Sequence, residues 1–469
     1  MPSGPLRARA LLPLAAVVAL ALPLRAQTPA ELTRLQDEAV RRTQEYLRIN
    51  TTNPPGNEAL TMEFFARILT QEGIAFDSAS SAPGRGNIWA RLKGGSEPAL
   101  VLLHHMDVVP ADPRYWDVDP FGSTIRDGDI FGRGALDTKT LGIVHLQTFL
   151  ALHRSKARLT RDVIFMATAD EEAGGAYGAG WIVANHPEAF KGAGMVLNEG
   201  GDGSLDDGRQ QFGIEVTQKV PLWLRVISTG EPGHGSMPPV ASSVNRLIRA
   251  MANLQEHEFT PRIVPAVDAY FKAIAPTAAP HWRAAFADMA RTVQDRGALL
   301  RLQLESPGSA ALTRNACSIT MLEGSGKINV VPPQAAAQLD CRLLPDQDHA
   351  AFIAELERTF NDPGIRIEKI MGFTAAVSPM DHPLYRTLVD VTRRRYPQAS
   401  IVPQVSTGFT DSHFFRDLGI ASYGYSPFLV PVAQEGGLHG NNERISVENV
   451  RTGTAMMLEI VQAMVRVQP

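Results

Sequence analysis

Short apolar runs alternate with amphipathic stretches through the first half of the chain. Apolar, β-favouring runs lie at 87–92, 99–103, 163–168 and 195–197. Stretches with apolar residues at helical spacing lie at 29–49, 58–72, 138–153 and 176–185. Strands that alternate with helices predict an α/β fold whose sheet is covered on both faces.

The pattern changes after about residue 220 and returns after about residue 372. A strand-like run at 222–229 precedes a helix-rich stretch at 243–305, strand-like runs around Cys317 and Cys341, a helix at 350–360 and a strand at 365–370. This mixture predicts an α+β insert. The α/β pattern then resumes and ends in a helix at 446–465. We therefore expect one α/β domain, built from 27–219 and 373–469, interrupted by a second domain at 220–372.

Residues 1–26 have the pattern of a cleaved secretory signal. Arg7 and Arg9 precede an apolar stretch at 10–24, and the small residue Ala26 marks the expected cut. The alternative is an N-terminal membrane anchor, for which the stretch is short. We expect a secreted or periplasmic protein with no stable membrane span after cleavage. Export permits a disulfide, so Cys317 and Cys341 are either bridged across two strands or two buried thiols.

Composition narrows the class of protein. The chain has 469 residues, of which 44% are hydrophobic and 20% charged, with a net charge of −4. This length favours two domains, and the composition fits a soluble globular protein. The small negative net charge does not favour a nucleic-acid partner.

Two adjacent histidines in "LLHHMDVV" end the apolar run at 99–103. Side chains two apart on a strand share a face, so His105 and Asp107 fall together and His104 points the other way. A metal-bound histidine usually gives its second ring N–H to a carboxylate, and only His105 has one in place. Taken alone, the same pair also fits a buried core histidine.

Four further motifs place carboxylates and a histidine at strand ends or in Gly-rich turns. They are "GRGALDTK" with Asp137, "ADEEAGG" with Glu171 and Glu172, "NEGG" with Glu199, and "LHGNNERIS" with His439. Individually these residues could be a helix cap, solvated loop charges or an exposed histidine. Together they form a nitrogen and oxygen donor set that suits zinc, and one carboxylate can bridge two metal ions.

These motifs, in order with "GEPGHGSMP", "KINVVPPQAAAQLDCRLLP" and "GFTDSHFFR", resemble the dizinc peptidase family of aminoacylase, glutamate carboxypeptidase and succinyl-diaminopimelate desuccinylase. The likeness covers nearly all of the chain after residue 26. The long insert and "NEGG" look closest to the branch of carboxypeptidase S and the secreted N-acyl-amino-acid hydrolases. The resemblance implies a mixed-sheet catalytic domain interrupted by an α+β lid and dimerisation domain.

The resemblance also implies roles for the site residues. His105 and Glu199 would hold one zinc ion, Glu172 and His439 the other, and Asp137 would bridge them. Asp107 would orient His105, and Glu171 would be the general base towards a water activated by the two ions. Cobalt or manganese could fill such a site in place of zinc. His104 stands where the family usually has a small residue, which predicts an extra polar wall of the metal pocket.

Four residues outside the metal motifs match family positions. His234 would donate to the oxyanion in the site of a neighbouring subunit, which implies a homodimer through the lid domain; a simple turn is the alternative. Arg342 would bind the substrate carboxylate, a role that suits its fork, or else make a structural ion pair. Gly408 and Thr410 belong to a loop that resembles the substrate-binding loop.

The expected activity is hydrolysis of an amide bond next to a free carboxylate. The substrate would be a peptide C-terminal residue, a dipeptide or an N-acyl amino acid. The alternatives are an aminopeptidase of the related dizinc fold and a non-catalytic relative kept for binding. A requirement for a free substrate N-terminus would favour the aminopeptidase. A non-catalytic relative is expected to lack a ligand or the base, and none is missing here.

Overall fold

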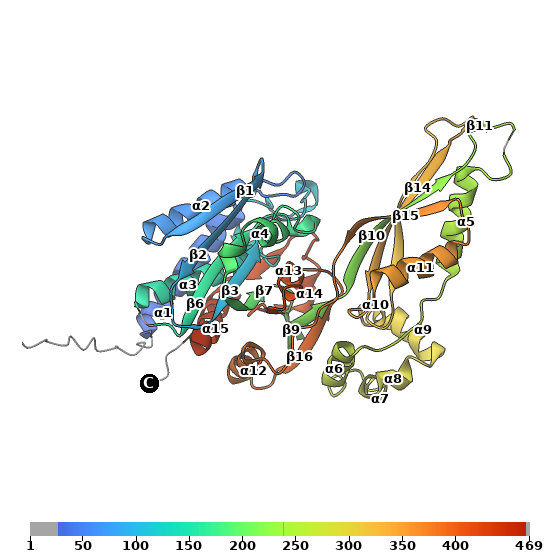
Figure 1. The fold of residues 1–469 in the computed structure, drawn as a ribbon. Coiled ribbons are helices and arrows are strands. Elements are labelled where there is room, and N and C mark those ends of the chain that lie inside the picture. The colour runs from blue at the N-terminus through green and yellow to red at the C-terminus, as the bar shows by residue number, and fades with distance from the viewer. Residues whose placement is uncertain (1–26, 157, 238, 466–469) are drawn as a thin grey trace, which may run out of the picture.

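A ten-stranded mixed sheet carries the first domain (Figure 1). Its strands are β1 (Phe76–Ala82), β2 (Arg85–Leu92), β3 (Glu97–His105), β6 (Arg161–Thr168), β7 (Ala193–Asn198), β8 (Gly203–Asp206), β9 (Arg209–Gln218), β16 (Ser400–Ser406), β17 (Ala421–Gly424) and β18 (Leu429–Pro431). They lie in the order β1-β2-β6-β3-β7-β17-β9-β8-β18, and β16 pairs with β9. This computed structural model describes residues 27–156, 158–237 and 239–465, so the predicted signal segment lies outside the described residues.

Helices cover both faces of this sheet. One face packs against α1 (Pro29–Leu47), α2 (Glu58–Gln71), α3 (Lys139–Ser155), α12 (Pro383–Arg395) and α15 (Val447–Val465); the other packs against α4 (Ala179–Asn185) and α13 (Ser412–Arg416). The alternation along β3 explains this, because Leu100 and Leu102 join the first core and Val101 and Leu103 the second. The predicted α/β fold is confirmed.

Adjacent parallel strands define the functional edge of the sheet. β3 pairs in parallel with β6 on one side and with β7 on the other. His105, the last residue of β3, stands opposite Thr168, the last residue of β6. The residues that follow these three strands therefore emerge side by side at the carboxyl edge, where open α/β sheets bind their ligands.

The second domain contains a four-stranded antiparallel sheet. Its order is β12 (Ala316–Glu323), β14 (Gln334–Leu343), β10 (Val220–Thr229), β15 (Ile365–Gly372). Helices α5 (Ser243–Glu256) and α11 (His349–Phe360) pack on it around a separate apolar core. Cys317 and Cys341 are register partners on β12 and β14 and form a disulfide, which decides between the two states considered for them.

The helices between α5 and β12 pack on the first domain. They are α6 (Pro265–Ile274), α7 (Arg283–Ala287), α8 (Met289–Thr292), α9 (Arg296–Glu305) and α10 (Pro307–Ala311). Val267 and Phe271 of α6 are fully buried in the same core as Phe212 of β9 and Val405 of β16. Residues 264–312 therefore join the core of the first domain through α6, although they lie inside the insert in sequence.

Short elements complete the fold. A three-stranded sheet is formed by β4 (Ile125–Arg126), β5 (Asp129–Phe131) and β19 (Arg444–Ser446), and a two-stranded one by β11 (Gly233–His234) and β13 (Val330–Val331). The remaining helical turns are η1 (Pro113–Tyr115), η2 (Glu171–Ala173), η3 (Pro187–Phe190) and α14 (Val432–Glu435). Among the described residues, no helix is long and apolar enough to cross a membrane.

Candidate dinuclear metal site

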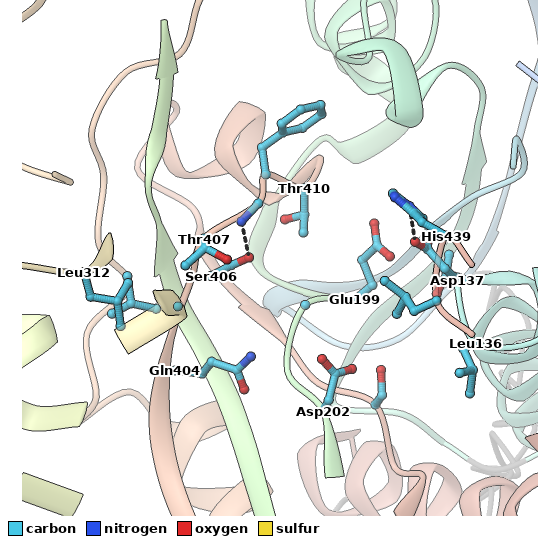
Figure 2. Close-up of a pocket in the computed structure, with 18 of the residues that line it drawn as sticks. Leu136, Asp137, Glu199, Asp202, Leu312, Gln404, Ser406, Thr407, Thr410 and His439 are labelled. Carbon is cyan, nitrogen blue, oxygen red and sulfur yellow. Dashed lines mark hydrogen bonds and ion pairs between the residues drawn. The ribbon is translucent and has the colours of Figure 1, made fainter. Parts of the chain in front are cut away.

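Six side chains of the first domain meet at the carboxyl edge of the sheet. Three segments that follow strands supply four of them: His105 ends β3, Glu171 and Glu172 form η2 after β6, and Glu199 follows β7. Asp137 precedes α3, and His439 lies in the loop between α14 and β19. Figure 2 shows Asp137 and His439 in contact, with Glu199 facing them. The structure thus brings together all six residues for which metal or base roles were predicted.

Asp137 lies between the two histidines. Its Oδ1 is 2.9 Å from His105 Nε2, and its Oδ2 is 3.0 Å from His439 Nε2. Glu199 Oε1 is 3.4 Å from His105 Nε2, and Glu172 Oε2 is 3.2 Å from His439 Nε2. The side chains form two groups that share Asp137, and within each group the ligand atoms lie within 4.8 Å of one another. These donor sets fit two zinc ions bridged by one carboxylate.

The charges of this cluster are poorly balanced by the protein alone. Burial raises the pKa of Glu199 to about 8, although His105 lowers it. Burial and the charge of Glu199 raise the pKa of Glu171 well above its usual range. Burial also raises the pKa of Asp137, but hydrogen bonds with His105 and His439 outweigh it and hold that pKa well below its usual range. Bound cations would relieve the repulsion among these carboxylates.

Asp107 connects the end of β3 with the turn that carries the two glutamates. Its carboxylate accepts hydrogen bonds from the backbone N–H groups of Glu171, at 3.1 Å, and Glu172, at 3.2 Å. It lies 3.4 Å from His105 Nδ1, while the Asp107 backbone carbonyl accepts from that nitrogen at 3.0 Å. Because a carbonyl oxygen only accepts, Nδ1 carries the proton and Nε2 is left to face the cluster.

The neighbouring histidine faces away from the cluster. His104 is fully buried, and its ring centroid lies 5.4 Å from that of Phe65, 5.5 Å from that of Phe165 and 6.2 Å from that of Tyr46. The prediction that His104 forms a polar wall of the metal pocket is wrong. Alternation along β3 puts it on the opposite, helix-covered face of the sheet.

Substitutions of the two histidines should therefore have different effects. We expect His105→Ala to lose bound metal, since His105 supplies the imidazole of its ligand group. His104→Ala should keep its metal but unfold at a lower temperature, because it leaves a hole among three aromatic rings. Elemental analysis and a melting curve on the same preparations measure both effects. Metal loss confined to the His104 variant would reverse the assignment.

Glu443 ties the loop of His439 to the turn that presents Asp137. Its carboxylate is fully buried and accepts three backbone N–H groups from that turn, those of Gly134, Leu136 and Asp137. It also pairs with Arg133 at 2.7 Å, and Arg133 donates to the Gly440 carbonyl at 2.7 Å. Sequence reasoning missed this residue. Its only signal was an acidic side chain after a Gly-rich loop, which fits a solvated charge equally well.

A cavity of about 720 Å³ opens beside the cluster. Gly408 and Thr410 line it from the segment after β16, and Glu171 lines it from the metal side. The Thr410 N–H donates to Gln218 Oε1 at 3.0 Å, which fixes that segment against the end of β9. Figure 2 shows Ser406, Thr407 and Thr410 on one side of Glu199, with Asp137 and His439 on the other.

Arg342 reaches the cavity from β14 of the second domain. Asp340 accepts from its Nε at 2.8 Å and from one terminal nitrogen at 3.2 Å. The other terminal nitrogen, Nη1, is buried and has no hydrogen-bond partner among the described residues. The guanidinium carbon lies 5.4 Å from the centre of the Phe409 ring. The ion pair considered for Arg342 is present, and it leaves one nitrogen available to a ligand.

His234 lies away from this cavity. It is exposed on β11 at the far tip of the second domain, and it is not among the cavity's lining residues (Figure 1). Its Nδ1 lies 2.7 Å from Ser236 Oγ. Within one described chain, His234 therefore takes no part in the site.

Comparisons with known proteins agree with this geometry. The sequence profile of Peptidase family M20/M25/M40 matches residues 101–463. N-fatty-acyl-amino acid synthase/hydrolase PM20D1 of Xenopus tropicalis is 31% identical over 382 residues, covering 77% of this chain and 72% of that protein. Aminoacylase-1B of Rattus norvegicus is 27% identical over 436 residues, covering 90% of this chain and 94% of that protein.

The fold is shared with solved structures. An M20 family metallo-carboxypeptidase from Sulfolobus solfataricus matches with a TM-score of 0.69 at 20% sequence identity. The match covers 91% of this chain and 99% of that one. Both the large mixed sheet and the inserted domain thus have a counterpart of known structure.

Proposed function

Because this chain belongs to Peptidase family M20/M25/M40 and is a hydrolytic enzyme, we propose that it cleaves an amide bond next to a free carboxylate. Its substrate is a C-terminal residue of a peptide, a dipeptide or an N-acyl amino acid, as the names of its aminoacylase and PM20D1 relatives suggest. The observation that carries the proposal is the pair of ligand groups sharing Asp137, beside a cavity that Arg342 also lines.

The residues of the site have distinct roles in the reaction: metal binding, proton transfer and positioning. His105, Glu199, Asp137, Glu172 and His439 hold two metal ions, zinc being the ion their donors suit best. When bound, such ions polarise the scissile carbonyl and acidify water. Glu171 takes the proton of the attacking water at its carboxylate and passes it to the leaving nitrogen. Asp107 keeps Glu171 in place through the backbone of the turn.

Recognition of the substrate carboxylate falls to Arg342 and the 408–410 segment. The bond to Asp340 orients the guanidinium, and Nη1 remains to donate to a carboxylate oxygen. Gly408 and Thr410 line the cavity from the same segment as Phe409, the ring beside the Arg342 guanidinium. A C-terminal amide offers the guanidinium a neutral carbonyl oxygen in place of a carboxylate oxygen, and this weaker bond disfavours amidated substrates.

A substrate screen by mass spectrometry tests this function. N-acyl amino acids, dipeptides and longer peptides are each offered as the free acid and as the matched C-terminal amide. Hydrolysis of free acids over their amides supports the proposal. Equal cleavage of both forms, or release of N-terminal residues that requires a free amine and ignores the C-terminus, would favour an aminopeptidase instead.

The enzyme acts outside the cytoplasm, as a secreted or periplasmic protein. The signal pattern in residues 1–26 and the Cys317–Cys341 disulfide support this localisation, since disulfides persist in oxidising compartments. Neither feature depends on the other. Together they favour export over a cytoplasmic role.

The enzyme also forms a homodimer through the second domain. Met237, Val240, Ile328 and Val330 expose apolar side chains around β11 and β13, and β12 is an edge strand of its sheet. Apolar tips and open edges are typical of surfaces that pair with another chain. In such a dimer, His234 of one subunit completes the site of the other.

Complementation between two inactive variants tests whether His234 of one subunit completes the site of the other. We expect Glu171→Ala and His234→Ala to be nearly inactive alone and to regain activity when unfolded together and reassembled. Random pairing makes half of the dimers mixed, and one of their two sites is intact, so roughly a quarter of all sites recover. Wild type carried through the same procedure is the control. Mixtures that stay inactive while wild type recovers, or a fully active monomer, would exclude the shared site.

A further inference from the structure

Asp202 places an uncompensated negative charge in the active-site cavity. It follows Glu199 by three residues, immediately before β8, and its exposed side chain lines the cavity (Figure 2). Among the described residues, that side chain makes no hydrogen bond or ion pair. Desolvation of Asp202 within the cavity and the charge of Asp137 raise the pKa of Asp202 to about 6, so it remains mostly ionised at neutral pH.

No cation of the cavity wall neutralises this carboxylate. The basic residues that line the cavity are Arg342, which is paired with Asp340, and His439, which contacts Asp137 and Glu172. Glu435, whose charge interacts with that of Asp202, has the same sign. Burial and the charge of Asp202 raise the pKa of Glu435. A cation supplied by a ligand would therefore be attracted to Asp202.

Ser426 lies beside the segment that carries Asp202. Its backbone N–H donates to the carbonyl of Gly201, the residue before Asp202, at 2.5 Å. Ser426 is only 8% exposed, lines the same cavity, and its hydroxyl has no hydrogen-bond partner among the described residues. The two carboxylate oxygens and the hydroxyl oxygen are three acceptors, which matches the three N–H donors of an ammonium group.

Asp202 and Arg342 line the cavity from different domains. Arg342 comes from β14 and lies beside Phe409, whereas Asp202 comes from the edge of the first domain and feels the charge of Asp137. A substrate whose carboxylate lies at Arg342, with its amide at the metal site, directs its acyl part towards Asp202. This orientation rests on the function proposed above.

We propose that Asp202 and Ser426 form a subsite for a positively charged amino group on the acyl side of the scissile amide. The enzyme then prefers peptides with an amino group at that position to N-fatty-acyl amino acids. A fatty chain packed against Asp202 would desolvate its carboxylate without offering a hydrogen bond in exchange, which costs binding free energy. The amino group can be a free N-terminus or a lysine side chain, which share the same chemistry.

Four substrates distinguish a free N-terminus from a lysine side chain as the source of the amino group. All four carry the same C-terminal residue X, the residue that is cleaved best in the screen. They are alanyl-X, N-acetylalanyl-X, Nα-acetyllysyl-X and N-palmitoyl-X. We expect kcat/KM to be highest for alanyl-X or Nα-acetyllysyl-X, and whichever leads identifies the α-amino or the side-chain amine as the ligand. Asp202→Asn should lower kcat/KM for that substrate about tenfold to a hundredfold and leave N-acetylalanyl-X unchanged.

Asp206→Asn is the matched control. Asp206 is the same residue type, lies on β8 and is paired with Arg209 at 2.6 Å, so its loss should not alter the order of substrates. Faster cleavage of N-palmitoyl-X than of both amines, or an equal fall of all rates in Asp202→Asn, would overturn the subsite while the hydrolase function stands. If wild type loaded with zinc cleaves neither these four nor any free acid of the screen, the proposed function itself fails; if it cleaves free acids of the screen but none of the four, only the subsite fails.

Discussion

Glu171→Gln is expected to lower kcat by about 10²- to 10⁴-fold while metal content stays at the wild-type level. Glu171 is only 6% exposed, lines the cavity and comes no closer to the ligand nitrogen His105 Nε2 than 3.9 Å. An amide of the same shape keeps the packing but cannot take the proton of the attacking water. Steady-state kinetics together with elemental analysis of the same preparation measure the two effects.

The adjacent residue is the control for this prediction. Glu172 Oε2 is 3.2 Å from His439 Nε2 and belongs to a ligand group, so Glu172→Gln should weaken metal binding first. Its activity should recover partly when excess zinc is supplied, whereas that of Glu171→Gln should not. If the Glu171 variant loses metal and the Glu172 variant keeps it, the two roles are reversed.

Removal of metal by a chelator should abolish activity, and zinc should restore it. The reason is the uneven charge of the cluster, in which burial raises the pKa of Glu199 to about 8. Burial and the charge of Glu199 also raise the pKa of Glu171 well above its usual range. Without cations, these carboxylates are partly protonated and cannot take their places as ligands and base. Activity and the melting temperature are measured before chelation, after it and after zinc is returned.

The melting temperature separates this outcome from simple inhibition by the chelator. Ions that bind the folded state stabilise it by mass action, so the metal-free protein should melt at a lower temperature and zinc should reverse the change. Cobalt and manganese, added in separate samples, show which ions the site accepts. Full activity in a preparation shown to contain no metal would exclude the mechanism.

The fold and half of the site follow from local patterns. The buried runs of β3, β6 and β7 are short, apolar and bounded by turns, and their ligands come within four residues of the strand ends. Strand alternation alone separated His105 from His104. These features are local because a parallel strand specifies its own faces and its own end.

The other half of the site depends on contacts between distant segments. Asp137 lies in the turn before α3, and His439 lies in the loop between α14 and β19. Glu443 holds the two segments together, because its carboxylate accepts hydrogen bonds from the backbone of the Asp137 turn. No local period signals such a contact. The motifs marked Asp137 and His439 as possible members of a metal donor set, and the resemblance to a family gave them their individual roles. No local period signals the available nitrogen of Arg342 either, because it depends on how Asp340 on the same strand pairs with it.

The packing of α6 against β16 sets an order on the folding of the chain. Val267 and Phe271 leave the ribosome long before Val405, the strand residue whose core they share. Until residues 400–406 have been made, the apolar side of 264–312 has no surface to cover it and is open to aggregation and proteolysis. A truncated product ending between 342 and 399 would therefore contain both cysteines of the second-domain disulfide and still expose the apolar face of these helices. Residues 400–406 must therefore be made before the apolar side of 264–312 can be buried, and a chain that ends earlier is a target for degradation.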